Sequence, residues 1–442
     1  MDSQAAYPGC WGVAVALACV CCAAYGQTAQ KGADVSRRTK EKLRVDYIGY
    51  RAARYETEAV VEPQNGRPNR GGFIRVYLTN TSGKDLQLAY YRCNGKDVSH
   101  WLLNGYFAWD RLYNQHLNPG QTTVLEINAV TGDFGAGQPF SFAYIDRSWL
   151  PACFREAILA EDPVQISLVR MLPGLRELEV HVRHTGGRRV VLGAVQVLGR
   201  NTEHLVWAGA THSVALKGPS YAIARIRLDH PLAAADLAVL RLSVEEDGDV
   251  RQIYAHRRAF EDWFPIGCWS AEPDTYGPLR RHHIELVVRG GRADHEFYSD
   301  IAPKYGFRTM CPTGAFDGLD TIRSLADHPA VACWMLADEP DWSTPPVVMM
   351  HSDAFARRNN RTKPTFITLC RNVKFFEYGP IADIPCMDHY CVTAPTSSKW
   401  PEPYGTRLEE TAYYTRDLKT ACEPKPIWVW SQAIASWDER PR

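Results

Sequence analysis

The sequence carries no excess of charge of either sign. Its 442 residues include 50 Lys and Arg against 50 Asp and Glu, which gives a formal net charge of zero at pH 7. Proteins that bind nucleic acids or membrane surfaces through bulk electrostatics need a basic face, and the Arg-Arg pairs of this chain are scattered along it. We therefore expect no nucleic-acid partner and no membrane contact beyond export.

The sequence also lacks the motifs that hold metal ions and cofactors. Outside residues 1–26 the cysteines include no Cys-x-x-Cys pair, and no Gly-x-Gly-x-x-Gly run follows an apolar segment. Zinc sites and dinucleotide sites depend on those spacings. We expect no cofactor and no metal site, and Cys386 and Cys391 are the one candidate pair for a disulfide bridge.

Lys and Arg are missing from residues 1–10, where a secretory signal peptide carries its positive charge. Residues 11–26 nevertheless form a short apolar run that ends in small residues and is too short to span a bilayer. We expect residues 1–26 to be a cleaved signal peptide and the protein to be secreted, periplasmic or on the cell surface. An uncleaved anchor and a misassigned start are the alternatives.

A helical period of 3.6 residues is absent between about Leu43 and Tyr144. Short stretches there alternate apolar and polar residues between turns, which is typical of strands with one buried face. The pattern starts again after residue 161, and Gly186-Gly187 predicts a two-residue hairpin turn between two of its strands. We therefore expect two all-β sandwich domains, over residues 42–160 and 161–258.

After Arg258 the alternation stops, and apolar runs of four to eight residues are separated by stretches long enough for helices. Such runs are typical of parallel strands buried on both faces. Near-equal spacing favours a (β/α)8 barrel over residues 259–442, incomplete at its C-terminus because the chain ends before an eighth strand. The seven expected strands are Trp263–Trp269, Ile284–Val288, Gly306–Met310, Val331–Leu336, Pro364–Leu369, Ile384–Met387 and Pro426–Trp430.

Polar and aromatic residues follow several of these runs, at the strand ends where a barrel of this kind has its active site. Aromatic faces stack on the C–H side of a sugar ring, while acids bond its hydroxyl groups and transfer protons. We therefore expect a carbohydrate partner and a site at this rim. The candidate residues are Trp269, Asp338, Glu339, Trp342, Arg371, Asp388, His389, Tyr390, Trp430 and Gln432.

The stretch HPAVACWMLADEPDW, residues 328–342, resembles the fourth-strand motif of the clan A (β/α)8-barrel glycoside hydrolases and their uncharacterised bacterial relatives. The stretches FPIGCW, YGFRTMCP and KPIWVWSQA agree with that family in order and placement. The resemblance covers residues 263–442. Two sandwiches before such a barrel are also similar to the layout of multidomain β-galactosidase-like enzymes.

The resemblance implies that Glu339 is the general acid/base and that Asp338 stands where the family has a sugar-binding Asn. It also implies a nucleophilic Glu at the end of the seventh strand, where this sequence has Gln432. An amide cannot form a glycosyl-enzyme ester. Asp388, or Asp338, could supply the second carboxylate; it could lie elsewhere in the protein; or the barrel binds glycan without cleaving it. Asp341 is expected to cap the following helix.

The sequence therefore predicts a glycosidase that acts on an oligo- or polysaccharide, with Glu339 and Asp388 as its catalytic residues. The alternative is a non-catalytic carbohydrate-binding or cell-surface protein built on a degenerate glycosidase barrel. A short carboxyl-to-carboxyl distance would favour the hydrolase.

Overall fold

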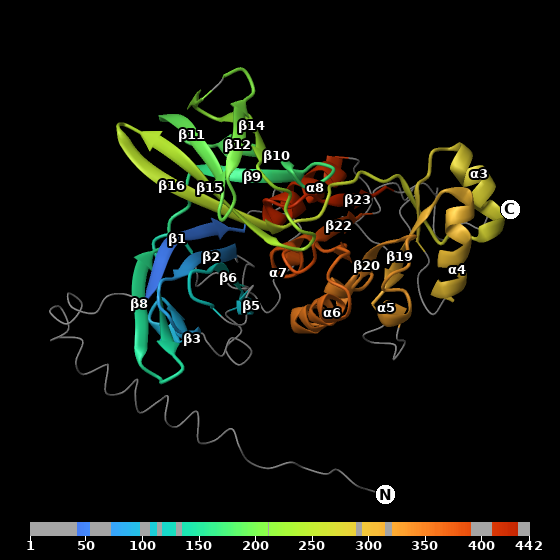
Figure 1. Ribbon diagram of the computed structural model, residues 1–442, viewed down its shortest axis with the longest axis horizontal. Helices are drawn as coiled ribbons and strands as arrows, with labels where there is room; N and C mark the ends of the chain where they lie inside the picture. The colour runs from blue at the N-terminus through green and yellow to red at the C-terminus, as the bar shows by residue number, and fades with distance from the viewer. Residues whose placement is uncertain are drawn as a thin grey trace, which may run out of the picture. The chain divides into compact units, whose positions relative to one another are not determined.

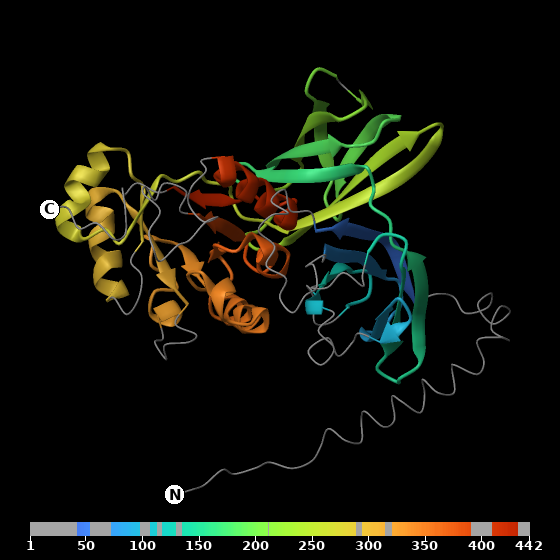
Figure 2. The same cartoon turned by 180° about the vertical axis from the view of Figure 1, so that it is seen from behind.

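The chain divides into two compact units, Met1–Lys42 and Leu43–Arg442, and the fold described below belongs to the second unit. The computed structural model is shown from two sides in Figures 1 and 2. It describes residues 42–53, 72–97, 107–112, 117–129, 135–210, 212–288, 294–313, 321–389 and 409–431. The expected signal peptide over residues 1–26 lies outside these residues.

The first part of the fold consists of two antiparallel sheets that share one core. One sheet has the order β1-β2-β6-β5, formed by β1 (Leu43–Ala52), β2 (Gly72–Asn80), β6 (Thr122–Ala129) and β5 (Phe107–Leu112). The other has the order β4-β3-β7-β8, formed by β4 (Lys96–Asp97), β3 (Leu86–Cys93), β7 (Pro139–Asp146) and β8 (Pro151–Ile158). Side chains such as Val76 and Phe142 meet in the core between the sheets, as in a β-sandwich.

The second part repeats this arrangement, again with one core between two antiparallel sheets. One sheet has the order β12-β14-β10-β9, formed by β12 (Thr202–Trp207), β14 (Ser220–Leu228), β10 (Glu177–His184) and β9 (Val164–Met171). The other has the order β13-β11-β15-β16, formed by β13 (Val214–Lys217), β11 (Arg189–Val197), β15 (Leu237–Glu246) and β16 (Asp249–Arg258).

The hairpin expected at Gly186-Gly187 is wrong. Strand β10 pairs with β9 and β14, whereas β11 pairs with β13 and β15, so the two glycines lead the chain from one sheet to the other. A Cβ on Gly186 would lie 3.1 Å from the Cβ of Pro163, and the Thr185 amide donates to the Pro163 carbonyl. The glycine therefore permits a close approach of two chain segments.

The third part is a parallel sheet of seven strands in sequence order, and each strand overlaps one of the seven expected runs. This confirms the predicted parallel pairing; a closed barrel is not shown. The strands are β17 (Gly267–Trp269), β18 (Leu286–Val288), β19 (Arg308–Pro312), β20 (Val331–Met335), β21 (Thr365–Leu369), β22 (Ile384–Asp388) and β23 (Trp428–Trp430).

Short helices connect these strands. The α-helices are α3 (Tyr276–Arg281), α4 (His295–Ile301), α5 (Thr321–Ser324), α6 (Pro346–Asn359), α7 (Phe375–Tyr378) and α8 (Glu409–Cys422). The 3-10 helices are η3 (Pro273–Thr275), η4 (Ala302–Tyr305), η5 (Pro340–Trp342) and η6 (Asn372–Lys374). In the part of the chain that the structure describes, no helix is both long and apolar enough to cross a membrane.

The parallel sheet is curled rather than flat. Five strands lie between its first and last strands, β17 and β23, yet the rings of Trp269 and Trp430 lie 5.8 Å apart. The rings of Trp263 and Trp428 lie 6.1 Å apart in the same way. These four rings line the inner core with Cys386, which is a buried free thiol; Cys391, its candidate partner for a bridge, lies outside the described residues.

A buried cluster of polar side chains joins the two sandwiches. The carboxylate of Glu126 on β6 is fully buried, accepts from Arg75 Nε at 3.0 Å and lies 3.9 Å from His256 Nε2 on β16. The other ring nitrogen of His256 lies 3.0 Å from the hydroxyl of Tyr77. Burial lowers the pKa of His256 to about 4, so this imidazole is neutral at pH 7.

We expect this histidine to make the protein sensitive to acid. Unfolded His256 takes up a proton below about pH 6.5 and the folded residue only below about 4, so stability falls as the pH drops through that window. From pH 6.5 to pH 4 the free energy of unfolding should fall by about 2 kcal/mol less in a His256→Gln variant than in the parent. Urea unfolding at the two pH values measures this difference. The exposed control His282→Gln should follow the parent, and equal losses in all three proteins would contradict the assignment.

Candidate active site

The ends of the parallel strands bring one carboxylate and two indole rings to the inner side of the curled sheet. Asp388 ends β22, two residues after the inward-facing Cys386, so its side chain leaves the strand on the same side. Trp269 ends β17 and Trp430 ends β23, and their rings contact each other. Asp388 is only 7% exposed. An acid and aromatic faces therefore meet at the same end of the sheet.

Glu339 follows β20 in a backbone conformation that non-glycine residues rarely adopt. Its φ is 44° and its ψ is 47°, in the left-handed region. This conformation costs a non-glycine residue roughly 1–3 kcal/mol and persists only where the surroundings fix it. The side chain is half-buried, while the neighbouring Asp338 is exposed. The loop therefore holds Glu339 in a strained and defined position.

The buried carboxylate of Asp341 fixes this loop. It is completely buried and accepts from the backbone amides of Cys370 at 3.0 Å and Arg371 at 2.7 Å, just beyond the end of β21. The expected helix cap is wrong, because η5 and α6 begin without a side-chain cap. Burial raises the pKa of Asp341, and the hydrogen bonds from these two amides act in the opposite direction. Asp341 thus ties the loop of Glu339 to the neighbouring strand.

Two further candidates, Trp342 and Arg371, are brought together at this loop. The guanidinium carbon of Arg371 lies 5.1 Å from the ring centroid of Trp342, and the ring is 44% exposed. A cation over an indole face is attracted by the ring. This pair offers an aromatic surface and hydrogen-bond donors next to Glu339.

The environment raises the pKa of Glu339 to about 7. Burial of the carboxyl contributes most, followed by the negative charges of Asp388, Asp338 and Asp341, while a hydrogen bond from the Trp342 side chain acts in the opposite direction. A carboxyl with a raised pKa stays protonated near neutral pH and can donate a proton. The influence of Asp388 also places the two predicted catalytic carboxyls in one electrostatic neighbourhood.

The remaining candidates do not all lie at the rim. His389 is buried, its ring stacks on Tyr414 of α8 at 4.1 Å, and burial lowers its pKa to about 4. It therefore points to the helix side of the sheet, opposite to Asp388. Tyr390 and Gln432 lie outside the described residues.

Two residues near the site were missed by the sequence interpretation. The indole nitrogen of Trp430 donates to the hydroxyl of Thr368 at 3.4 Å, which positions that ring over the end of β21. The thiol of Cys370 donates to Asp341 at 3.5 Å. Thr368 could have been found from the two-residue period that starts at the inward-facing Phe366.

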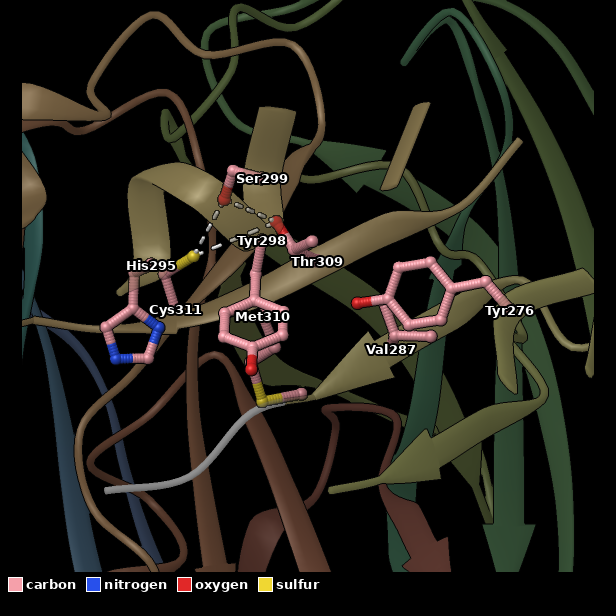
Figure 3. Close-up of a pocket in the computed structure, with 8 residues that line it drawn as sticks. All are labelled: Tyr276, Val287, His295, Tyr298, Ser299, Thr309, Met310 and Cys311. Carbon is pink, nitrogen blue, oxygen red and sulfur yellow. Dashed lines mark hydrogen bonds between the residues drawn. The ribbon is translucent and has the colours of Figure 1, made fainter. Parts of the chain in front are cut away.

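A small pocket lies elsewhere, between helices α3 and α4 and the outer faces of β18 and β19 (Figure 3). It encloses about 220 Å³ of space, part of which is open to solvent. Its Ser299 hydroxyl lies 3.2 Å from that of Thr309 and 3.5 Å from the Cys311 thiol (Figure 3). These groups satisfy one another, so the pocket is a polar packing defect rather than a second candidate active site. Among the described residues, no group of His, Cys, Asp or Glu is placed to hold a metal ion.

No protein-family model and no curated protein sequence matches the chain. Similar solved structures include the β-glucuronidase of Parabacteroides merdae, at 12% identity and a TM-score of 0.29, over 86% of this chain and 57% of that one. A putative β-galactosidase from Bacteroides fragilis has 11% identity and a TM-score of 0.31, and the match covers 82% of this chain and 63% of that one. The β-D-glucuronidase of Dictyoglomus thermophilum is 12% identical with a TM-score of 0.31, and the match covers 92% of this chain and 86% of that one.

The chain thus spans less than two thirds of the length of the first two of these proteins.

The raised pKa of Glu339 predicts a measurable effect on stability. The folded carboxyl keeps its proton up to about pH 7 and the unfolded one only to about 4.5, so the parent protein loses stability as the pH rises through this window. The free energy of unfolding of the Glu339→Gln variant should therefore exceed that of the parent by about 2 kcal/mol at pH 8 and equal it at pH 4. The variant is thus the more stable protein at pH 8.

Urea unfolding at both pH values measures the difference. The matched control is Glu296→Gln, which changes an exposed glutamate in the first turn of α4; it should lower the free energy of unfolding at pH 8 by less than about 1 kcal/mol and should not raise it, because a carboxylate there favours the helix N-terminus. A Glu339→Gln variant that is no more stable than the parent at pH 8 would contradict the raised pKa of Glu339.

Proposed function

We propose that this protein hydrolyses a glycosidic bond in an oligo- or polysaccharide, with Glu339 as the general acid. The observation that carries the proposal is a half-buried carboxyl at the end of a parallel strand whose pKa is raised to about 7, with a second carboxylate, Asp388, contributing to that shift. Glycoside hydrolysis needs two carboxyl groups of which one is protonated at working pH.

In the proposed reaction, Glu339 gives its proton to the oxygen of the leaving sugar as the bond from that oxygen to the anomeric carbon breaks. A water molecule adds to the anomeric carbon, and Asp388 takes the proton that the water loses. The carboxylate of Asp388 also stabilises the positive charge that develops on the sugar ring. This direct attack by water inverts the anomeric configuration; a carboxyl separation of about 5–5.5 Å in the substrate complex would instead favour Asp388 as the nucleophile of a retaining reaction.

The rings of Trp269, Trp430 and Trp342 would stack on sugar faces, and Asp338 and Arg371 would bond hydroxyl groups at the rim. Tyr390 and Gln432 stay predicted substrate contacts from the sequence. His389 is no longer proposed as a contact, because its ring packs against α8. A closed (β/α)8 barrel and export through residues 1–26 are part of the same proposal.

The second candidate function is carbohydrate binding without cleavage. It is favoured by Gln432, which stands where the resemblance implies a nucleophilic Glu. An enzyme that uses Asp388 as its second carboxyl does not need that Glu, so activity measurements separate the two candidates.

Activity on a panel of aryl glycosides and polysaccharides tests the proposal. We expect Glu339→Gln to lower kcat by roughly 10²–10⁴-fold and Asp388→Asn to lower it comparably, because each removes one proton-transfer group. The kcat/KM of the parent should fall as the pH rises above about 7, where Glu339 loses its proton.

The Glu296→Gln protein is the control and should keep the parent rate. Full turnover by Glu339→Gln would remove the assignment of the acid. Specific glycan binding by a parent protein that turns over no substrate would favour the second candidate.

A further inference from the structure

The sheet formed by β3, β7 and β8 has an outward face on which an aromatic row crosses three strands. The register pairs Tyr90 with Ala143 and Ala143 with Phe154, so these side chains lie side by side on one face. Along β7 the alternate residues Phe142 and Tyr144 are buried, which confirms that Ala143 faces outward. Phe154 is 55% exposed. The small Ala143 leaves a shallow floor between two rings about 10 Å apart.

A polar row runs parallel to the aromatic row on the same face. Arg92 pairs with Ser141 and Ser141 with Glu156, each two residues along the strand from its aromatic-row neighbour. The two rows are therefore about 7 Å apart. The guanidinium carbon of Arg92 lies 4.8 Å from the ring centroid of Tyr90, so it is held against the aromatic row. This row supplies donors and acceptors with no net charge.

The turn between β7 and β8 presents a tryptophan to the solvent. The carboxylate of Asp146, which is 1% exposed, accepts from the amides of Ser148 at 2.9 Å and Leu150 at 3.1 Å. Two backbone hydrogen bonds close the same turn. Trp149 at its tip has a φ of 60° and is 69% exposed. The turn thus fixes an exposed indole in a strained conformation, as is found at binding sites.

We propose that this face of the first sandwich binds an uncharged oligosaccharide chain. The aromatic row and Trp149 would stack on the C–H faces of successive sugar rings, and the polar row would bond their hydroxyl groups. The site is separate from the rim around Glu339, and its binding does not depend on the proposed hydrolysis.

The chemistry of the face favours a glycan over other occupants. One cation and one anion, Arg92 and Glu156, flank the rings, so the face does not complement a polyphosphate or an anionic membrane. Addition of a strand from a second copy is disfavoured at the edge strand β8, because Arg155 Nη1 donates to the backbone carbonyl of Phe154 at 3.0 Å. A flat row of rings beside a row of polar groups matches the two sides of a sugar ring.

Affinity electrophoresis of the full chain tests the site, with mixed-linkage β-glucan, xylan, galactomannan or pullulan in the gel. All proteins carry Glu339→Gln so that the gel polysaccharide is not consumed. We expect retardation by at least one of these polysaccharides, and a dissociation constant raised at least tenfold by Phe154→Ala and by Trp149→Ala. The matched control Phe297→Ala removes a phenyl ring of similar exposure, 49%, from α4 and should bind as the parent does.

Thermal unfolding of each variant checks that the fold is kept; since Phe154 is exposed, its variant tests the site even if Trp149→Ala disturbs the turn. Retardation that both variants leave unchanged would overturn the proposal and place binding at the rim. An absence of retardation by all four polysaccharides would also overturn it. If Phe154→Ala or Trp149→Ala then changed the sedimentation mass or the binding to phosphatidylcholine–phosphatidylglycerol vesicles, the occupant of the face would be a second copy of the chain or a membrane. Loss of turnover by Glu339→Gln with retained, Phe154-dependent binding would support both proposals separately.

Discussion

The candidate active site depends on the hydrogen bonds between the buried carboxylate of Asp341 and two backbone amides beyond the end of β21. They fix the loop after β20 against the neighbouring strand, although the loop contains Glu339 in a left-handed conformation. One of these amides belongs to Arg371. The hydrogen bond that fixes the loop of Glu339 therefore also fixes the backbone from which the Arg371 guanidinium reaches Trp342. One buried group therefore positions the acid and its nearest rim contacts.

This arrangement explains why charge and burial occur together in one segment. A buried carboxyl is stable only where hydrogen bonds satisfy it, and Asp341 accepts them from two backbone amides, which oppose the rise of its pKa on burial. Glu339 has no such set of amides, and the negative charges around it make ionisation harder, so its carboxyl keeps a proton. The strain at Glu339 and its unfavourable charge environment both reduce stability, which is common where a site is shaped for chemistry.

Much of the fold could be predicted because burial on both faces produces unbroken apolar runs, and each of the seven runs contains a strand. Features that depend on distant partners could not. The glycines at 186 and 187 mark a turn, but only the pairing of β10 and β11 with other strands shows that they join two sheets. The amides that Asp341 accepts from lie about 30 residues further on, so a local pattern predicted a cap. The two-residue period, in contrast, already separates Asp388 from His389.

The most direct measurement of the central claim is the pKa of Glu339 itself. Carbon-13 NMR of protein labelled in its glutamate carboxyls, with the signal assigned from its loss in Glu339→Gln, follows this titration. The account predicts a midpoint near pH 7 that falls in Asp388→Asn, because that change removes one of the charges that raise the pKa. A midpoint between about 4 and 5, as in a solvated glutamate, would contradict a protonated Glu339 and with it the proposed general acid.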